Sequence, residues 1–357
     1  MSHFAVLVIT PEQPSQDDLA KILAPWHEFE CTGIDDEYVQ DIDKTEEALA
    51  EYAKATVIRL KGPDGTLHDR FDEKGEWKPE FSKVDPEWGH GRIAFIPPGF
   101  ESVEIPASEV ETAAKWIKDY YGWSVAGRDP GEETKYGYIE LDAAGNVTTC
   151  IDRTNPNKKW DWWVLGGRWS GHLRVKEGAE AIVGRPGVMG SRSSDHRLAA
   201  DQACKREIDF DTPRAEAHAS ALALWDSVHA AIDGLPAFDD FDAVREQHGE
   251  DIAAARDAYW KQPAVAALRE KFKDSWGLDR EIEAARMDRD AFAQREANSA
   301  LATFAIVHDG KWLERGEMGW FGMTFNEKDQ ADWSGQFRKL IDDLPESAWL
   351  SVVDCHI

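Results

Sequence analysis

The chain has 357 residues, of which 42% are hydrophobic and 31% are charged, and its formal net charge is −27. This composition predicts a folded, soluble protein, and the negative charge disfavours direct binding to nucleic acid. No apolar run approaches the ~20 residues needed to cross a membrane, and the first residues lack the basic start of a signal peptide. Four scattered cysteines without a CxxC pair fit a reducing compartment. We therefore expect a cytoplasmic protein that does not associate with membranes.

Predicted strands and short helices alternate along the first half of the chain. Residues 3–9 form a β-branched apolar run typical of a buried strand, and residues 17–29 have helical spacing that Pro25 is expected to end. Further patterns predict strands at 56–60 and 93–96, an amphipathic helix at 109–121, and a hairpin formed by 136–141 and 146–151. More strands are expected within 160–175, and the turn-rich residues 184–194 predict a loop.

Alanine, charged residues and helical periodicity dominate the chain from about residue 195 to residue 299. The pattern predicts helices at 217–232, 241–260, 265–272 and 282–292. Strand character returns at 303–308 and 349–353, with an amphipathic helix between them at 332–344.

The two ends of the chain are expected to share one sheet, because each contributes apolar strands. We predict an α+β fold with a ferredoxin-like antiparallel sheet formed from both termini and a largely helical insertion. The predicted regions are an N-terminal α+β region (residues 1–194), the helical insertion (residues 195–299) and a C-terminal region (residues 300–357) that completes the sheet.

Four stretches have distinctive sequences: the opening MSHF, LAPWHEFECTG at 23–33, NPNKKWDWWVLGGRW at 155–169 and VVDCHI at 352–357. They resemble an uncharacterised family found largely in tailed phages and their bacterial hosts. The resemblance implies a phage or bacterial cytoplasmic setting. It brings no activity and no site residues.

Charge is distributed unevenly along the chain. Residues 1–52 contain thirteen acids and two bases, whereas residues 153–206 contain eleven bases and five acids. The basic segment is expected either to attract an anionic ligand or to dock against the acidic N-terminal segment.

The basic segment overlaps a tryptophan-rich block, which supplies the leading functional hypothesis. Aromatic faces beside arginines can stack a base and hold a phosphate. The predicted ligand-binding residues are Trp160, Trp162, Trp163, Arg168, Trp169, Arg185 and Arg192. Core packing is the competing interpretation, because aromatic residues more often build cores. For residues 184–194, an anion-binding nest or lid competes with an ordinary solvent loop.

Histidine, carboxylates and a thiol near residue 30 support a second hypothesis, a metal-dependent hydrolase with a divalent metal as cofactor. The predicted metal ligands are His27, Glu28, Asp35, Asp36, Asp354 and His356. The last two would point the same way from a C-terminal strand, with Cys355 opposite, and could join the set if that strand lies beside the first one near His3. No HExxH motif is present, so hydrogen bonding to the backbone is the competing interpretation.

The favoured function is a phage-associated soluble protein that binds a small anionic, nucleotide-like ligand through a Trp/Arg pocket. The metal-dependent hydrolase is the alternative. A second alternative is an acidic interaction protein, or nucleic-acid mimic, that inhibits a host defence system through a protein partner. In that case the acidic cluster at 35–51 would occupy the partner's basic groove, although such clusters usually serve as solvated faces. The sequence does not decide whether the ligand is also processed in a reaction.

Overall fold

The computed structural model describes residues 2–28, 36–72, 74–86, 89–126, 135–186, 198–249, 251–275, 277–319 and 323–357. The chain separates into two compact units. Unit 1 comprises Met1–Ala24 with Lys159–Ile357, and unit 2 comprises Pro25–Lys158. This division differs from the predicted one. Residues 25–158 form a unit of their own within the predicted N-terminal region, whereas the helical segment belongs to unit 1.

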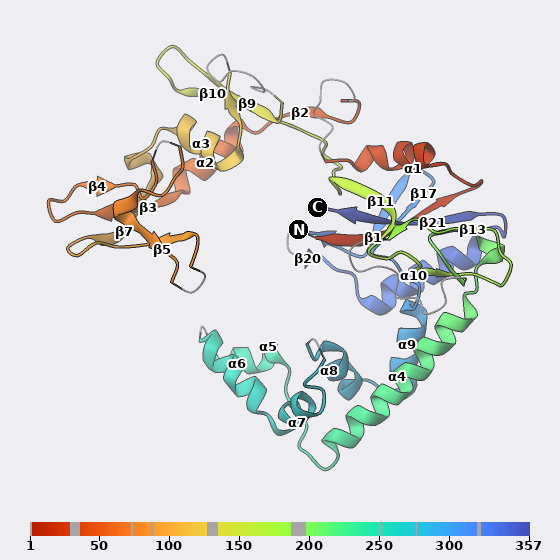
Figure 1. Ribbon diagram of the computed structural model, residues 1–357. Coiled ribbons are helices and arrows are strands. Elements are labelled where there is room, and N and C mark those ends of the chain that lie inside the picture. The colour runs from red at the N-terminus through yellow and green to blue at the C-terminus, as the bar shows by residue number, and fades with distance from the viewer. Residues whose placement is uncertain are drawn as a thin grey trace. The chain divides into compact units, whose positions relative to one another are not determined.

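Unit 1 is built around an eight-stranded sheet (Figure 1). Its strands are β1 (His3–Thr10), β11 (Trp162–Gly167), β13 (Ala181–Ile182), β14 (Arg185–Pro186), β16 (Gln202–Cys204), β17 (Ala305–His308), β18 (Lys311–Glu314) and β21 (Trp349–His356). The order along the sheet is β13-β16-β21-β1-β17-β18, and β11 pairs with both β21 and β14. Two small ribbons join β12 (Leu173–Arg174) to β15 (Ala199–Ala200) and β19 (Glu317–Met318) to β20 (Thr324–Phe325).

Both termini contribute to this sheet. Strand β1 pairs with β21 along its whole length in antiparallel register, from His3↔His356 to Thr10↔Trp349. On its other side β1 pairs with β17 in parallel register. The predicted α+β fold with both ends in one sheet is therefore confirmed, but the sheet is mixed rather than antiparallel throughout.

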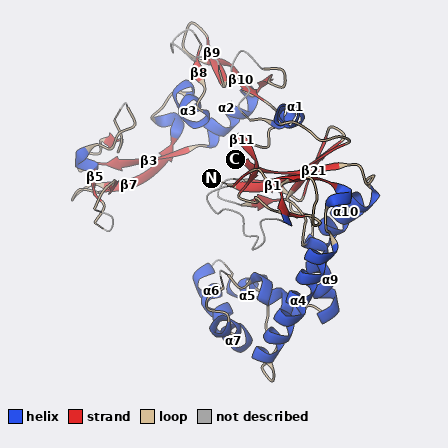
Figure 2. Cartoon of the chain, turned by 45° about the vertical axis from the view of Figure 1, so that its right-hand side comes forward, coloured by secondary structure: helices blue, strands red, loops and turns tan. Residues whose placement is uncertain are grey.

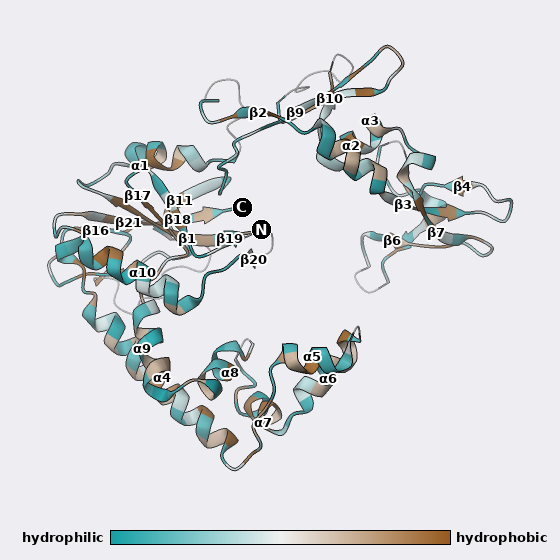
Figure 3. Ribbon diagram, turned by 180° about the vertical axis from the view of Figure 1, so that it is seen from behind, coloured by the Kyte–Doolittle hydropathy of each residue, from teal (hydrophilic) through white to brown (hydrophobic). Residues whose placement is uncertain are grey.

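Two helices flank the sheet on opposite sides, α1 (Gln16–Leu23) and α10 (Gln330–Asp343) (Figure 1). A capping box at Ser15 begins α1, and the Asp329 carboxylate caps α10. The apolar side of α10 packs against one face of the sheet in a shared core, whose larger members include Leu7, Ile306, Trp333, Phe337, Ile341, Leu350 and Val352. Figure 3 shows the hydrophobic colouring on the sheet strands between the two helices.

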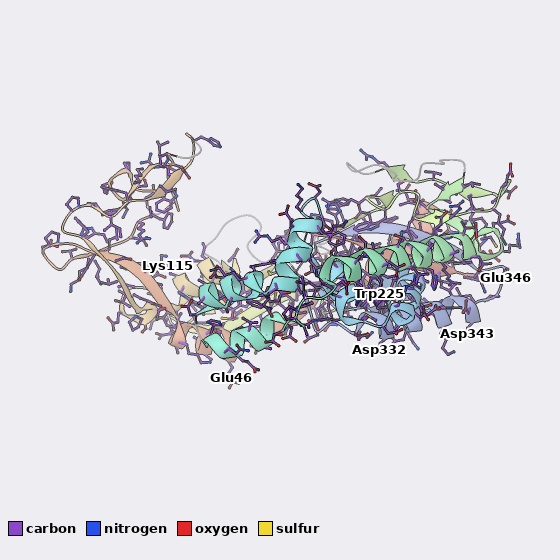
Figure 4. The ribbon with its side chains drawn as sticks, turned by 90° about the horizontal axis from the view of Figure 1, so that it is seen from below. Glu46, Lys115, Trp225, Asp332, Asp343 and Glu346 are labelled. Atoms are coloured by element: carbon purple, nitrogen blue, oxygen red, sulfur yellow. The ribbon has the colours of Figure 1, made fainter. Side chains whose placement is uncertain are left out.

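Helices alone make up the segment from residue 211 to residue 299 (Figure 2). They are α4 (Asp211–Ile232), α5 (Phe241–His248), α6 (Ile252–Lys261), α7 (Pro263–Lys271), α8 (Asp279–Arg286) and α9 (Arg289–Ser299). The predicted helices 241–260 and 282–292 are each broken in two, because Asp251 and Asp288 cap new helices inside them. Trp225 on α4 (Figure 4) stacks on His229 and donates from Nε1 to the Met287 carbonyl oxygen, which ties α4 to the end of α8.

Unit 2 contains helices and small sheets. Its elements are β2 (Gln40–Asp43), α2 (Thr45–Lys54), β3 (Thr56–Lys61), β4 (Leu67–His68), β5 (Ser82–Val84), β6 (Arg92–Ala94), β7 (Glu101–Pro106), α3 (Ala113–Tyr121), β8 (Ser124–Val125), β9 (Gly137–Leu141) and β10 (Val147–Thr154). The sheets follow the orders β2-β10-β9-β8, β4-β3-β7 and β5-β6. The predicted hairpin is confirmed as β9–β10, with Asp142 accepting the turn amides of Ala144 and Asn146. Among the described residues, no helix is long and apolar enough to cross a membrane.

Candidate functional site

Three neighbouring strands of unit 1 bring Trp162, His356 and His3 side by side. In the register of the sheet, Trp162 pairs with His356, and His356 pairs with His3. Because side chains alternate along a strand, Asp354 faces the same side of β21 as His356, whereas Cys355 faces the other side. The expectation that the C-terminal strand lies beside the first one near His3 is confirmed.

Each of the two histidines is held by a carboxylate. The Nδ1 atom of His3 lies 2.9 Å from Oδ1 of Asp354, and Nδ1 of His356 lies 2.7 Å from Oδ1 of Asp161. Asp354 is 1% exposed, so its pair with His3 is largely shielded from solvent. The carboxylates fix the orientation of both rings, and no described residue bonds to either Nε2 atom.

The two imidazole rings and the Trp162 indole form one aromatic group. The histidine rings meet edge to face with their centroids 4.9 Å apart. Trp162 stacks on His356 at 5.0 Å with an interplanar angle of 14°, and it meets the edge of His3 at 5.2 Å. Because Trp162 is 43% exposed, this group reaches the surface.

Asp354 also holds the glycine turn that follows β11. Its Oδ2 atom accepts a hydrogen bond from the backbone N of Arg168 at 2.9 Å. The preceding Gly166 and Gly167 have φ of 83° and 54°. A methyl group on Gly167 would overlap the Asp354 side chain, and one on Gly166 would overlap the side chain of Asp201. Both positions therefore require glycine, for the backbone angle and for the close approach.

A second buried carboxylate, Asp201, fixes the same turn from the other side. Its oxygens accept from the backbone N of Gly171 at 2.5 Å, from the backbone N of Gly184 at 2.6 Å and from Ser170 Oγ at 3.0 Å. Burial raises the pKa of the Asp201 carboxyl, although these hydrogen bonds act in the opposite direction. Asp201 thus joins the turn after β11 to the segment that leads into β14.

Arg168 and Arg185 lie at this doubly anchored turn. Arg168 directly follows Gly167. Strand β14 runs parallel to β11, and Arg185 of β14 pairs with Gly166 of β11. Both side chains are exposed. Within the described part of the chain, neither guanidinium has an ion-pair or hydrogen-bond partner. Two cations without acidic partners are notable in a chain whose net charge is −27.

The predicted Trp/Arg residues do not form one continuous surface. Trp160 is buried, and Trp169 packs against the core of unit 1. Trp163 pairs with Cys355 and so faces away from Trp162. Arg192 lies outside the described residues. Of the predicted set, Trp162, Arg168 and Arg185 are exposed; Trp162 begins β11, whereas Arg168 and Arg185 lie at the turn that ends it.

The predicted metal ligands are divided between the two units. His27, Glu28 and Asp36 belong to unit 2, whereas Asp354 and His356 belong to unit 1, and Asp35 is not among the described residues. In the part of the chain that the structure describes, no group of three or more His, Cys, Asp or Glu side chains could hold a metal ion. The predicted six-residue metal site is thus not found there.

Local contacts give the His27 segment a structural role. Asn155, which is fully buried, donates from Nδ2 to the carbonyl oxygens of Pro25 and His27 at 2.8 and 3.0 Å. Glu28 lies 3.6 Å from the Lys158 ammonium. The two distinctive stretches at 23–33 and 155–169 therefore meet where the chain enters and leaves unit 2.

Sequence reasoning gave no role to Asp161 or Asp201, and it treated His3 only as a neighbour of the C-terminal strand. For Asp161 the only signal was its position between Trp160 and Trp162 in the tryptophan-rich block. Asp201 carried no comparable signal. No family model, no curated protein and no solved structure matches this chain. The function must therefore be inferred from the chemistry of the site.

Proposed function

We propose that the protein binds a small anionic, nucleotide-like ligand at the Gly166–Gly167 turn. The observation that carries this proposal is the pair of arginines, Arg168 and Arg185, which lie at one turn without acidic partners among the described residues. A guanidinium presents several N–H donors in a plane and can bind a phosphate through two hydrogen bonds. In a strongly acidic chain, such a local positive charge favours a ligand that is itself negatively charged.

The surroundings of the turn support a ligand with an aromatic ring as well as a phosphate. Trp162 is exposed and is braced by the His356 ring, so a base could stack on its open surface. Base stacking on an aromatic side chain contributes about 1–3 kcal/mol. Asp201 and Asp354 hold the backbone of the turn before any ligand arrives, which lowers the entropy lost on binding.

Removing either arginine is expected to weaken binding about tenfold. We expect Arg168→Ala and Arg185→Ala to have this effect on the affinity for adenosine 5′-monophosphate and for inorganic phosphate, because each removes charged hydrogen bonds worth about 1.5–3 kcal/mol. Isothermal titration calorimetry with the full chain measures both affinities. Arg256→Ala, which removes an exposed arginine from α6, is the matched control and should leave them unchanged.

Unchanged affinity in both site variants would overturn the assignment of these arginines. Failure of the wild-type chain to bind either probe at millimolar concentration would overturn the proposed function itself. Equal weakening in Arg256→Ala would point to a general effect of charge rather than to a site.

The setting and the finer fold class remain proposals. We infer a reducing, cytoplasmic compartment, as in the phage-associated proteins that the sequence resembles, because Cys150, Cys204 and Cys355 are free and buried. For a ferredoxin-like core, β1, α1, β17, β18, α10 and β21 follow the β-α-β-β-α-β order when the elements between α1 and β17 are set aside, whereas the direct parallel pairing of β1 with β17 departs from an antiparallel sheet. Neither the metal-dependent hydrolase nor the acidic interaction protein is favoured by a contact among the described residues.

A further inference from the structure

We propose that His3 and His356 form the acid–base pair of a metal-independent phosphoesterase that cleaves the bound ligand. This inference rests on the proposed function, because it needs a phosphate ester held at the Gly166–Gly167 turn. It goes beyond binding by assigning a hydrolytic reaction to the histidines.

The geometry favours chemistry at the outer edges of the two rings. Both histidines use Nδ1 to contact a carboxylate, at 2.9 Å for His3 and 2.7 Å for His356. This fixes the orientation of each ring, while Nε2 stays without a partner among the described residues. The side chains of His3 and His356 keep 12% and 7% of their surface exposed.

The pair is also placed where a purely structural role is hard to justify. His3, Asp354 and His356 continue the same sheet face that carries Leu7, Leu350 and Val352 in the core. Burying a titratable side chain at the end of an apolar face removes it from water, and this costs free energy that an apolar side chain in the same place would not cost.

The two sets of residues are linked through Asp354. One oxygen of Asp354 contacts His3, and the other accepts the backbone N of Arg168. His3 and the arginine turn are therefore held by one buried carboxylate. The backbone N of Arg168 therefore lies close to the His3 ring, on the other oxygen of the same carboxylate.

The reaction is the hydrolysis of a phosphodiester, in which one histidine acts as base and the other as acid. One Nε2 atom takes a proton from a water molecule, and the water oxygen forms a bond to phosphorus. The ester P–O bond breaks, and the protonated Nε2 of the other ring gives its proton to the leaving oxygen. The products are a phosphate monoester and an alcohol, and exchange with solvent restores both rings. No oxidant, reductant or metal ion takes part.

The test uses hydrolysis of bis(p-nitrophenyl) phosphate by the full chain in the presence of EDTA. We expect the wild-type chain to release p-nitrophenol, and His3→Gln and His356→Gln to lower kcat on the order of 100-fold each. Their affinity for inorganic phosphate should stay within about twofold, because glutamine leaves the arginine turn intact. His248→Gln, an exposed histidine at the end of α5, is the matched control and should keep full activity.

A further variant keeps the test interpretable if the histidine variants fail to fold. Asp161→Asn keeps a hydrogen-bonding side chain beside His356, and we expect it to lower kcat about tenfold with unchanged circular dichroism. Wild-type protein that binds phosphate but releases no p-nitrophenol in EDTA would overturn this inference and leave the proposed function standing. So would glutamine variants that are folded and retain more than half of the activity. Wild-type protein that binds no phosphate would instead overturn the proposed function.

Discussion

Gly167→Ala is expected to lower the free energy of unfolding of unit 1 by about 3 kcal/mol. Two physical causes add together. Gly167 has a φ of 54°, a left-handed conformation that disfavours alanine by about 1–2 kcal/mol. The added methyl group would also overlap the side chain of Asp354, which is buried and engaged on both oxygens. Overpacking of this kind typically costs about 1–3 kcal/mol.

Gly178→Ala separates the two causes. Gly178 has a φ of 81°, but a methyl group there would meet no atom within 4 Å. We therefore expect only the conformational part of the effect, about 1 kcal/mol. Urea denaturation followed by circular dichroism measures both variants against wild type. Equal destabilisation of the two would contradict a close approach of Asp354 to the turn.

The strands of the central sheet could be predicted because their signals are local. The apolar runs at 3–9 and 349–353 identified both terminal strands, and strand alternation placed Asp354 and His356 on one face with Cys355 on the other. Pairing the two ends followed from composition alone, since buried strands at both termini need a common sheet. The parallel pairing of β1 with β17 did not follow, because direction depends on the path of the intervening chain.

The sequence could have shown that the tryptophans of this block face different sides of the sheet. Trp162 and Trp163 are adjacent in a strand, so they must face opposite sides, whatever the strand pairs with. Trp160 and Trp169 flank the strand, and their burial depends on residues distant in the sequence. The density of tryptophan therefore indicated where a site was expected, but not which of the rings are exposed there.

Unit 2 and the roles of Asp161 and Asp201 could not be predicted from the sequence, for a different reason. The contact of His356 with Asp161 joins residues 195 positions apart, and Asp201 meets Ser170 across 31 positions. Periodicity and composition report on neighbouring residues, whereas these contacts depend on the register between separate segments. The boundaries of unit 2 at Pro25 and Lys158 likewise depend on Asn155 reaching back to Pro25 and His27.

Asp201→Ala is expected to lower the free energy of unfolding of unit 1 by about 4 kcal/mol and to weaken phosphate binding at the turn. The substitution leaves the backbone N–H groups of Gly171 and Gly184 without their acceptor, and each such loss costs about 1–3 kcal/mol. It also removes the carboxylate that links the segment carrying Arg185 to the turn carrying Arg168, leaving only the pairing of β14 with β11 to hold them together. Thermal and urea unfolding measure the first effect, and calorimetric titration with inorganic phosphate measures the second.

The effect of Asp201→Ala on stability should depend on pH, in a direction set by the raised pKa of the carboxyl. Burial raises the pKa of Asp201 above its ordinary value of 3.8, so the folded chain binds this proton more tightly than the unfolded chain. The stabilising contribution of Asp201 is therefore fully present below pH 3.8 and declines as the pH rises through the raised pKa. We expect the difference in unfolding free energy between wild type and Asp201→Ala to be larger near about pH 4 than near about pH 7.

Ser170→Ala is the matched control for this pH dependence. It removes one donor to Asp201 but leaves the titrating carboxyl and both backbone contacts in place, so we expect a loss of about 1 kcal/mol. Because Asp201 still titrates in this variant, its stability should change with pH in parallel with that of wild type. A wild-type advantage over Asp201→Ala that stays constant from about pH 4 to about pH 7 would show that burial does not perturb this carboxyl. An advantage that grows as the pH rises would show that the hydrogen bonds to the ionised form outweigh its burial.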